Sequence, residues 1–340
     1  MRRIFTLFII CAVVIAAVGA SFVQDVFYLS PKQNATPVEV VIAQGSSVSA
    51  IASQLKQSNL LSHPTFFRWF VTWTQTENKL QAGTFTLLPE TPIAAIVMAL
   101  SNSKGSEIKM TIPEGFTSQQ IKERVFAAFP QMDQLAWNQY VSGKSLTDFS
   151  EEILTGIPPG FGLEGYLFPD TYRFAKKTIA KEMIGNMLAT LKMRFADNGE
   201  SIPQSLKFSN GMTLHEVLTM ASIIEKEVQT PEDMKHVAGI LFNRMKIGMP
   251  LQVDSTLTYV NQKTSATLTT ADLKMESLYN SYTHKGLPPG PICNPGMNAI
   301  LAVLHPTASQ DIYFLTTNDG KTIYAQTHDQ HVANKQKYLK

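Results

Sequence analysis

Cysteine and charged residues are both scarce in this chain of 340 residues. Its 2 cysteines are Cys11, inside an apolar run, and Cys293, in a loop, so the sequence predicts no disulfide framework. Charged residues make up 16% of the chain, and the formal net charge is +2. This balance gives no electrostatic reason to expect a nucleic acid as a partner.

Motifs for cofactors and metals are missing too. The chain has no GxSxG, no phosphate-binding P-loop, no GxGxxG directly after a strand and no CxxC. HEVL at His215 fails the HExxH zinc pattern because residue 219 is threonine, and His328 with His331 is more typical of a surface pair. We therefore expect neither a metal site nor a bound cofactor.

The N-terminus predicts a membrane anchor. Arg2 and Arg3 precede an uncharged, mostly apolar run at residues 4–23, close to the ~20 residues that span a bilayer. A cleavable signal peptide is the alternative, but its apolar core would be shorter, at roughly 7–15 residues. We expect residues 1–23 to be a cytoplasmic stub and single-pass anchor in a bacterial inner membrane, with the arginines inside and the rest in the periplasm. Residues 24–37 are expected to be a linker.

The remaining chain predicts an α+β fold in two parts. Residues 38–101 alternate strand, helix, helix, strand and a short helix, and carry no pattern of catalytic side chains. Residues 106–340 are expected to form a larger, mixed α+β domain. Its expected strands are 107–115, 311–317 and 322–327, and its expected helices are 117–129, 131–142, 179–196, 213–229 and 231–247.

One carboxylate stands where the helix pattern favours an apolar residue. In TLHEVLTMASIIEKEVQ (213–229), Glu225 falls within the apolar stripe, whereas Glu216 and Glu227 point the opposite way, as solvated charges would. The stripe consists of Leu214, Val217, Leu218, Ala221, Ile224 and Val228. Burial would raise the pKa of Glu225, as a general acid near neutral pH requires. A buried ion pair with Arg244 of the next helix is the alternative, and the pattern leaves both open.

Polar and aromatic side chains gather in the loops that follow. GLPPGPICNPG (286–296) is a rigid loop rich in proline and glycine. Amides and aromatic rings near a buried carboxylate suit a sugar ligand, because amides bond hydroxyl groups and rings stack on pyranose faces. The candidates are Gln252, Asp254, Asn280, Tyr282 and Asn294. A glycosidase normally needs a second carboxylate, for which Asp170, Glu164 and Asp254 are available.

Five segments, in this order, resemble the endolytic murein transglycosylases of the MltG, or YceG-like, family: LEGYLFPDTY, ASIIEKE, NRMKIGMPLQVD, YNSY and GLPPGPICNPG. The resemblance extends over essentially the whole chain and implies that residues 38–101 are a LysM-like subdomain. Ser255 and Leu278 stand where the family usually has proline, which concerns loop stiffness rather than catalysis.

The resemblance implies that Glu225 is the catalytic glutamate of an endolytic lyase. By analogy, it would protonate the β-1,4 bond between MurNAc and GlcNAc in nascent glycan strands. It would then take the proton of the C6 hydroxyl that attacks C1, leaving a 1,6-anhydroMurNAc end that terminates strand elongation. No water and no second carboxylate are needed. The family motifs contain the expected cleft residues, Glu164, Tyr166, Gln252, Asp254, Asn280, Tyr282 and Asn294.

Two alternative functions remain. A hydrolytic muramidase would use Asp254 or Glu164 as its second carboxylate, and a non-enzymatic wall-binding scaffold for synthases would need none. The expected partners are peptidoglycan glycan strands and the lipid of the inner membrane, with no nucleic acid. Peptidoglycan synthases are a further candidate partner.

Overall fold

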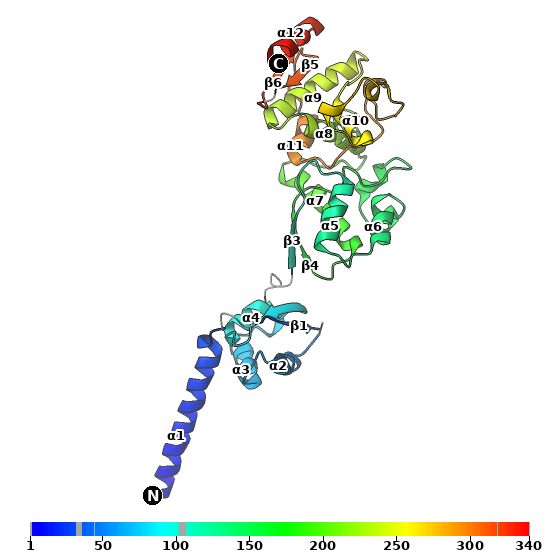
Figure 1. The fold of residues 1–340 in the computed structure, drawn as a ribbon. Coiled ribbons are helices and arrows are strands. Elements are labelled where there is room, and N and C mark those ends of the chain that lie inside the picture. Colours follow the sequence, from blue (N-terminus) through cyan, green and yellow to red (C-terminus); the bar gives the residue numbers. More distant parts are fainter. Residues whose placement is uncertain (1, 32–35, 44, 102–106, 318, 340) are drawn as a thin grey trace. The chain divides into compact units, whose positions relative to one another are not determined.

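The computed structural model describes residues 2–31, 36–43, 45–101, 107–317 and 319–339 (Figure 1). The chain divides into two compact units. The small unit comprises residues 1–108 and 173–177, and the large unit comprises residues 109–172 and 178–340. The sequence pattern places a boundary near residue 106 but gives no sign that residues 173–177 return to the small unit.

The small unit has the strand, helix, helix, strand order that the pattern predicts. Its strands β1 and β2 are antiparallel, with Val38 opposite Leu87 and Ile42 opposite Gly83. The side chain of Ser47 caps α2. The described elements are α1 (Arg2–Val23), a π-helix (Gln24–Tyr28), β1 (Val38–Ile42), α2 (Val48–Gln57), α3 (Pro64–Trp73), a 3-10 helix (Glu77–Lys79), β2 (Gly83–Leu87) and α4 (Ile93–Ser101).

The N-terminal helix is long and apolar enough to cross a membrane. Its window Ile9–Tyr28 has 20 residues and a mean hydropathy of 2.2, and 11% of the window is buried inside the protein. The end of the helix is different, because the π-helix Gln24–Tyr28 buries Asp25 and Val26 in the small unit. Packed structure therefore extends into the stretch 24–37 that was expected to be a linker.

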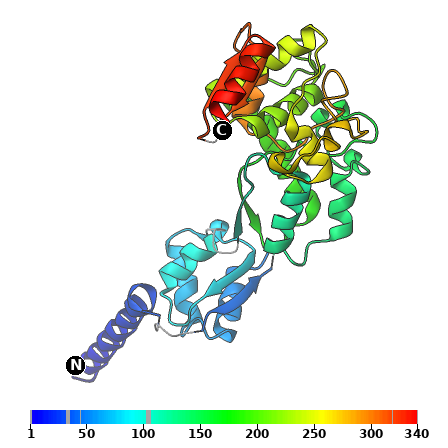
Figure 2. The ribbon, with the colours of Figure 1, turned by 45° about the horizontal axis from the view of Figure 1, so that its top comes forward.

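The large unit is mostly helical, and its last helix packs against the β5–β6 hairpin (Figures 1 and 2). In that hairpin, Tyr313 pairs with Ala325 and Thr316 pairs with Thr322. After the small unit the chain forms β3 (Glu107–Thr111), α5 (Ser118–Ala128), α6 (Gln134–Val141), β4 (Thr171–Ala175), α7 (Ala180–Asp197), α8 (Leu214–Glu227), α9 (Pro231–Lys246), α10 (Asp254–Asn261), α11 (Met297–Leu304), β5 (Tyr313–Thr316), β6 (Thr322–Ala325) and α12 (His328–Tyr338), with 3-10 helices at Leu146–Asp148, Glu152–Gly156, Ser265–Thr267 and Asp272–Lys274.

Four of these strands and α-helices are absent from the sequence prediction: β4, α10, α11 and α12. The helices α10 and α11 have 8 residues each, too short for an apolar period to show clearly. The helix α12 buries no residue and so has no apolar stripe. The strand expected at 107–115 ends at Thr111, because Pro113 follows and Gly115 turns the chain with a φ of +74°.

Helix α8 is buried on nearly every side, not along one stripe. Thr213 caps it in a capping box with Glu216, which is exposed as predicted. The helices α9, α10 and α11 all pack against it. The buried residues of the helix are Leu214, His215 and the continuous run from Val217 to Ile224. Besides Glu216, the residues of α8 outside the core are those of its last turn, from Glu225 on.

Candidate functional site

The buried side chain of Asn294 joins three segments of the large unit near the end of α8. It accepts a hydrogen bond from the backbone N–H of Leu167 at 2.9 Å. It donates to the carbonyl of Phe116 at 2.9 Å and to the carboxylate of Glu164 at 3.0 Å. The backbone joins the same segments, because Gly115 N–H donates to the Asn294 carbonyl at 2.9 Å. A fully bonded buried amide of this kind fixes the relative position of the loops around it.

Ser222 attaches the same loop to α8. Its hydroxyl accepts the backbone N–H of Ile292 at 2.9 Å, and its carbonyl accepts the thiol of Cys293 at 3.3 Å. Burial raises the pKa of the Cys293 thiol well above its usual range. This thiol is therefore part of the packing and not a nucleophile.

Glu225 is half-buried in the last turn of α8. Its Oε2 accepts the backbone N–H of Gly296 at 3.0 Å. Burial raises the pKa of Glu225, the Gly296 bond lowers it, the negative charge of Glu114 raises it and the positive charge of Lys226 lowers it, with a net rise. A carboxyl group whose pKa is raised in this way suits a general acid.

Two helix ends act on Glu225 in opposite directions. The C-terminal end of α8 carries partial negative charge and disfavours a carboxylate there. The N-terminal end of α11, whose cap residue is Gly296, carries partial positive charge and favours it. The end of α8 thus favours the protonated form of Glu225, and the start of α11 favours its ionised form.

Arg244, the alternative partner considered for Glu225, is engaged elsewhere. Its guanidinium donates to the carbonyls of Ile312, at 2.7 Å, and Leu251, and lies 5.5 Å from the ring centroid of Tyr313. The carboxyl group on which its charge acts is that of Glu227. A simple Glu225–Arg244 ion pair does not account for the buried carboxylate.

Glu114, which the sequence reasoning missed, lies beside Glu225. A Cβ atom added to Gly296 would lie 2.0 Å from Glu114 Oε1, so the Glu114 carboxyl group covers the glycine that bonds Glu225. A Cβ atom on Gly115 would lie 3.5 Å from Glu225 Cγ and 3.4 Å from Lys226 Nζ. The two glycines let the loops come close to Glu225, and the PEG and NPG triplets at 113–115 and 294–296 are the only local signal of it.

Glu164 is a second carboxyl group with a raised pKa. It accepts hydrogen bonds from the Ser118 N–H at 2.9 Å, from the Ser118 hydroxyl at 2.8 Å and from Asn294. The hydroxyl of Tyr259 lies 3.4 Å from it. Desolvation outweighs these donors and raises the pKa of Glu164 to about 7. Glu164 lines the larger cavity of this region.

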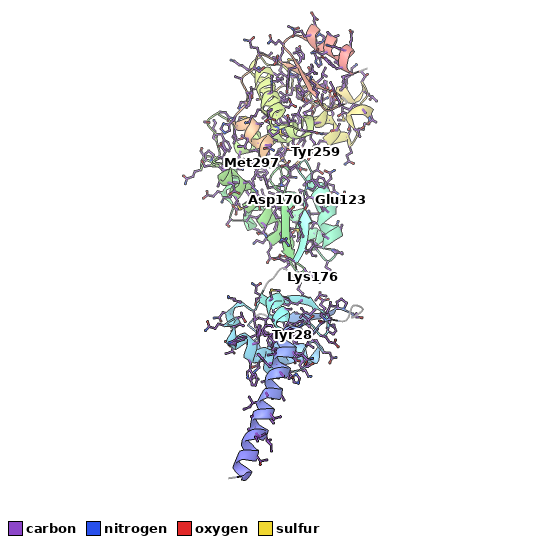
Figure 3. All side chains as sticks on the ribbon, turned by 90° about the vertical axis from the view of Figure 1, so that its left-hand side faces the viewer. Tyr28, Glu123, Asp170, Lys176, Tyr259 and Met297 are labelled. Atoms are coloured by element: carbon purple, nitrogen blue, oxygen red, sulfur yellow. The ribbon has the colours of Figure 1, made fainter. Side chains whose placement is uncertain are left out.

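Two clefts meet beside the end of α8. The first has a volume of about 1020 Å³ and lies between α5 and the Tyr259 side of α10; Figure 3 marks Glu123 and Tyr259 among its lining residues. The second has a volume of about 680 Å³ and lies between α10 and the β5–α12 region. Lys226, Ser255 and Thr258 line both. The two clefts are thus adjacent at the residue that follows Glu225.

Gln252, Asp254 and Tyr282 line the second cleft. Gln252 is exposed, with a left-handed φ of +48°, and the Tyr282 hydroxyl donates to Asp254 Oδ1 at 2.5 Å. The structure therefore brings these three predicted cleft residues together, but in the second cleft and not in the one that Glu164 lines.

The prediction that Glu227 is a solvated charge is wrong. This residue was expected to be an ordinary solvated charge, yet it lines the second cleft, and desolvation is the main cause of its raised pKa. Ser255 and Arg244 lower this pKa, and Asp254 raises it. The prediction failed because it assumed one buried face for α8, whereas Arg244 of α9 and Asp254 and Ser255 of α10 lie close to Glu227.

Three other predicted residues lie in buried or ion-paired positions. Tyr166 is fully buried, and its hydroxyl lies 3.2 Å from Nδ1 of His215. Asn280 is fully buried and donates to the carbonyls of two residues in the 273–275 loop. Asp170, one candidate second carboxylate, forms an ion pair with Arg194. Their contacts support the fold around the clefts.

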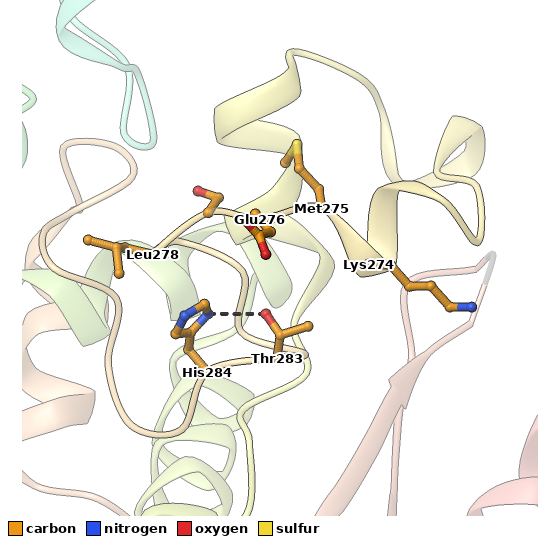
Figure 4. A pocket seen from close by; sticks show the side chains of 7 residues that line it. Lys274, Met275, Glu276, Leu278, Thr283 and His284 are labelled. Atoms are coloured by element: carbon orange, nitrogen blue, oxygen red, sulfur yellow. Dashed lines mark hydrogen bonds between the residues drawn. The ribbon is translucent and has the colours of Figure 1, made fainter.

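A further cavity of about 660 Å³ lies in the loop that contains Lys274 and His284 (Figure 4). There Thr283 Oγ1 and His284 Nδ1 are 3.1 Å apart, and both side chains face the cavity. Within the described part of the chain, no group of three or more His, Cys, Asp or Glu side chains is placed to hold a metal ion.

The chain is similar to known proteins of one family. Residues 40–337 match the YceG-like family. A Bacillus subtilis (strain 168) protein named endolytic murein transglycosylase is 31% identical over 336 residues, which cover 95% of this chain and 91% of that protein. A protein of the same name from Streptococcus pneumoniae (strain ATCC BAA-255 / R6) is 28% identical over 93% of this chain, and this chain spans 61% of its length.

One solved structure is similar over most of the chain. It is the crystal structure of a YceG-like protein from Listeria monocytogenes, with a TM-score of 0.57 and 30% identity. The alignment covers 88% of this chain and 99% of that one. The family range 40–337 includes Glu225, Glu164, the first cleft and all residues of the second cleft except Leu339.

Proposed function

Because this chain belongs to the YceG-like family, we propose that it is an endolytic murein transglycosylase, a lyase that cuts peptidoglycan glycan strands internally. The observation that carries the proposal is the placing of Glu225. This carboxyl group has a raised pKa and lies one residue before Lys226, where two open clefts meet. A glycan strand that occupied both clefts would pass beside it, and an open groove suits a cut within a strand.

Glu225 would act first as an acid and then as a base. Protonated Glu225 gives its proton to the glycosidic oxygen between MurNAc and GlcNAc, and the bond from C1 to that oxygen breaks. The resulting carboxylate, held by the Gly296 N–H, takes the proton of the MurNAc C6 hydroxyl as its oxygen bonds C1. Atoms balance without water: the products are a 1,6-anhydroMurNAc end and a free GlcNAc hydroxyl.

The other residues would bind and position the strand. Glu164 and Tyr259 in the first cleft, and Gln252, Asp254 and Tyr282 in the second, offer hydrogen-bonding groups and aromatic rings to sugar units. Asn294 would act indirectly, since it is buried and holds Glu164.

We further propose that α1 anchors the protein in the inner membrane, with both units on the periplasmic side. The charges of Arg2 and Arg3 support this orientation. The strand, helix, helix, strand order supports a LysM-like small unit. Peptidoglycan synthases remain a proposed partner class.

Mass spectrometry of digestion products tests the proposal. We expect the full chain, incubated with purified peptidoglycan, to release muropeptides with anhydro ends from within strands, and we expect Glu225→Gln to release almost none. Glu216→Gln is the matched control, because Glu216 is an exposed carboxylate on the same helix. Reducing ends alone from the wild type would reject the lyase. No product from a folded wild type would favour the non-enzymatic scaffold.

A hydrolytic muramidase is the second candidate, because Glu164 is a further carboxyl group in the first cleft with a pKa of about 7. In that case Glu164 would activate water, and its substitution would abolish cleavage as completely as Glu225→Gln. In the lyase, Glu164→Gln should lower the rate but leave anhydro products.

A further inference from the structure

The end of the membrane helix is fastened to α3 of the small unit. Asp25 is buried, and its carboxylate lies 2.7 Å from Nδ1 of His63, the cap residue of α3. The ring of Phe22 lies 5.4 Å from the ring of Phe66, in an edge-to-face arrangement. Farther along, Phe27 lies 5.9 Å from Phe70 in the same geometry. One hydrogen bond and two aromatic contacts therefore hold α3 at the end of α1.

Two tryptophans that contact Phe66 and Phe70 extend into solvent. Trp69 and Trp73 are separated by one helical turn and lie on one face of α3, with exposed fractions of 52% and 70%. Trp69 packs 5.8 Å from Phe66, and Trp73 packs 6.1 Å from Phe70. Exposed indoles on this scale are uncommon on a surface that faces only water.

The position of Phe22 places this face near the bilayer. The apolar window extends to Tyr28, but the first charged residue after the run 4–23 is Asp25, so we place the exit of a spanning helix from the hydrocarbon at Phe22. The ring of Trp69 is 6.3 Å from the ring of Phe22. Trp69 must then lie within a few ångströms of the membrane surface, at the level where tryptophan side chains accumulate in membrane proteins.

The side chains around Trp69 are also of the kinds found at a membrane surface. Phe27 and Tyr28, at the end of the π-helix, are 48% and 75% exposed. The exposed Arg68 precedes Trp69, and α3 contains no acidic residue. The acidic side chain bonded to this helix is that of Glu77, which accepts the Thr72 hydroxyl at 2.8 Å. Aromatic rings beside a basic side chain suit the headgroup region of an anionic membrane.

We propose that α3 lies on the outer surface of the membrane that α1 crosses, with Trp69 and Trp73 inserted among the lipid headgroups. The small unit is then held on the bilayer by a second contact besides its anchor. The ligand of this face is the headgroup and upper acyl region of the lipid. The inference rests on the proposed membrane placement of α1 and is independent of the role of Glu225.

Tryptophan fluorescence in the full chain tests the inference. The chain has 3 tryptophans, and the third, Trp137, is fully buried in the large unit. In nanodiscs of phosphatidylcholine and phosphatidylglycerol, Trp137→Phe leaves Trp69 and Trp73 as reporters. We expect lipids brominated near the top of the acyl chain to cause roughly a twofold loss of emission, lipids brominated near its end to cause less, and aqueous acrylamide to quench weakly.

The double variant Trp69→Phe/Trp73→Phe is the control, because its remaining tryptophan should not respond to brominated lipid. If Trp137→Phe fails to fold, the difference between the wild type and the double variant gives the same signal. Strong acrylamide quenching without bromine quenching would overturn the inference. Resistance to both quenchers would overturn it too, because it would mean that protein covers the indoles.

Labelling of Cys11 tests the membrane placement of α1 independently of the α3 contact. Cys11 is exposed on α1, whereas Cys293 is buried, so a membrane-impermeant maleimide reports on Cys11. Protected Cys11 with unquenched tryptophans would reject the α3 contact alone. Reactive Cys11 in nanodiscs would reject the anchor and, with it, the inference. Release of anhydro muropeptides tests the enzyme separately.

Discussion

The small and large units bury different kinds of side chain. The small unit has one apolar cluster, with residues such as Phe67, Phe85 and Ile96 almost fully buried, and its buried Asp25 is paired with His63. The large unit also buries a polar set: His215, Thr219, Ser222, Arg244, Ser255, Thr256, Asp272, Asn280, Ser281, Asn294, Thr317 and Thr322. Buried polar groups cost free energy unless they are bonded, so a unit with many of them has an ordered internal network. In the large unit, that network positions carboxyl groups whose pKa values are raised.

The largest expected effect is the difference in kcat between the Glu225 and Glu227 variants. Glu225→Gln should lower kcat by about 10²–10⁴-fold, because an amide cannot supply the proton. Glu227→Gln should lower kcat by no more than about tenfold, because we place Glu227 in the wall of the second cleft. Steady-state release of muropeptides measures both, and circular dichroism checks that each variant is folded. The reverse order of the two losses would move the catalytic role to Glu227.

A core substitution in the small unit should lower stability without lowering the rate of cleavage. Phe67→Ala removes a fully buried ring from the apolar cluster and should destabilise the small unit by about 3–5 kcal/mol. The cleavage rate of soluble glycan fragments should not change, because the clefts lie in the large unit. Hydrogen exchange resolved by segment measures the first effect, and product release measures the second. Val41→Ala, at an exposed position of the same unit, is the control.

Within the large unit, two buried asparagines should differ in function. Asn294→Ala and Asn280→Ala each leave buried backbone groups without a partner and should cost about 2–3 kcal/mol. Of the two asparagines, Asn294 alone bonds Glu164, so only Asn294→Ala should also lower kcat at temperatures where both variants are folded. Thermal unfolding combined with muropeptide release distinguishes them. Equal losses of kcat would show that the network acts through stability alone.

The smallest expected effect is a shift in pH dependence. Glu225 must be protonated for the first step, so activity falls as pH rises through its pKa. Glu114→Gln removes a negative charge that raises this pKa, so the falling limb of kcat/KM should move to lower pH. Glu123→Gln, which alters an exposed carboxylate in the first cleft, should leave the limb in place. A shift to higher pH in Glu114→Gln would contradict the contact with Glu225.

Long helices and the unusual place of Glu225 could be predicted from the sequence, because both depend on local periodicity. Helices α7, α8 and α9 agree with the predicted ranges to within a few residues. The partial burial of Glu225 follows from the apolar stripe on either side of it. The loop 286–296 was also recognisable as a site element from its proline, glycine and asparagine content.

The neighbours of Glu225 could not be predicted, because they depend on contacts between distant segments. Glu114 lies beside Glu225 because its carboxyl group covers Gly296, which bonds Glu225 and is far away in the sequence. Glu227 is desolvated by α9 and α10, and the pattern of α8 alone contains no information about them. The end of α1 was expected to lead into a linker, yet Asp25 is fixed by a hydrogen bond with His63, a residue that periodicity does not connect to it.

The origin of the oxygen atoms in the products tests the central claim most directly. Digestion of peptidoglycan by the wild-type chain in ¹⁸O-labelled water should give anhydro ends without label, because the C6 hydroxyl of MurNAc is the attacking group. Mass spectrometry of the released ends reads the label. MurNAc reducing ends that carry ¹⁸O at C1 would show that water attacks, and would contradict a single glutamate acting in turn as acid and base.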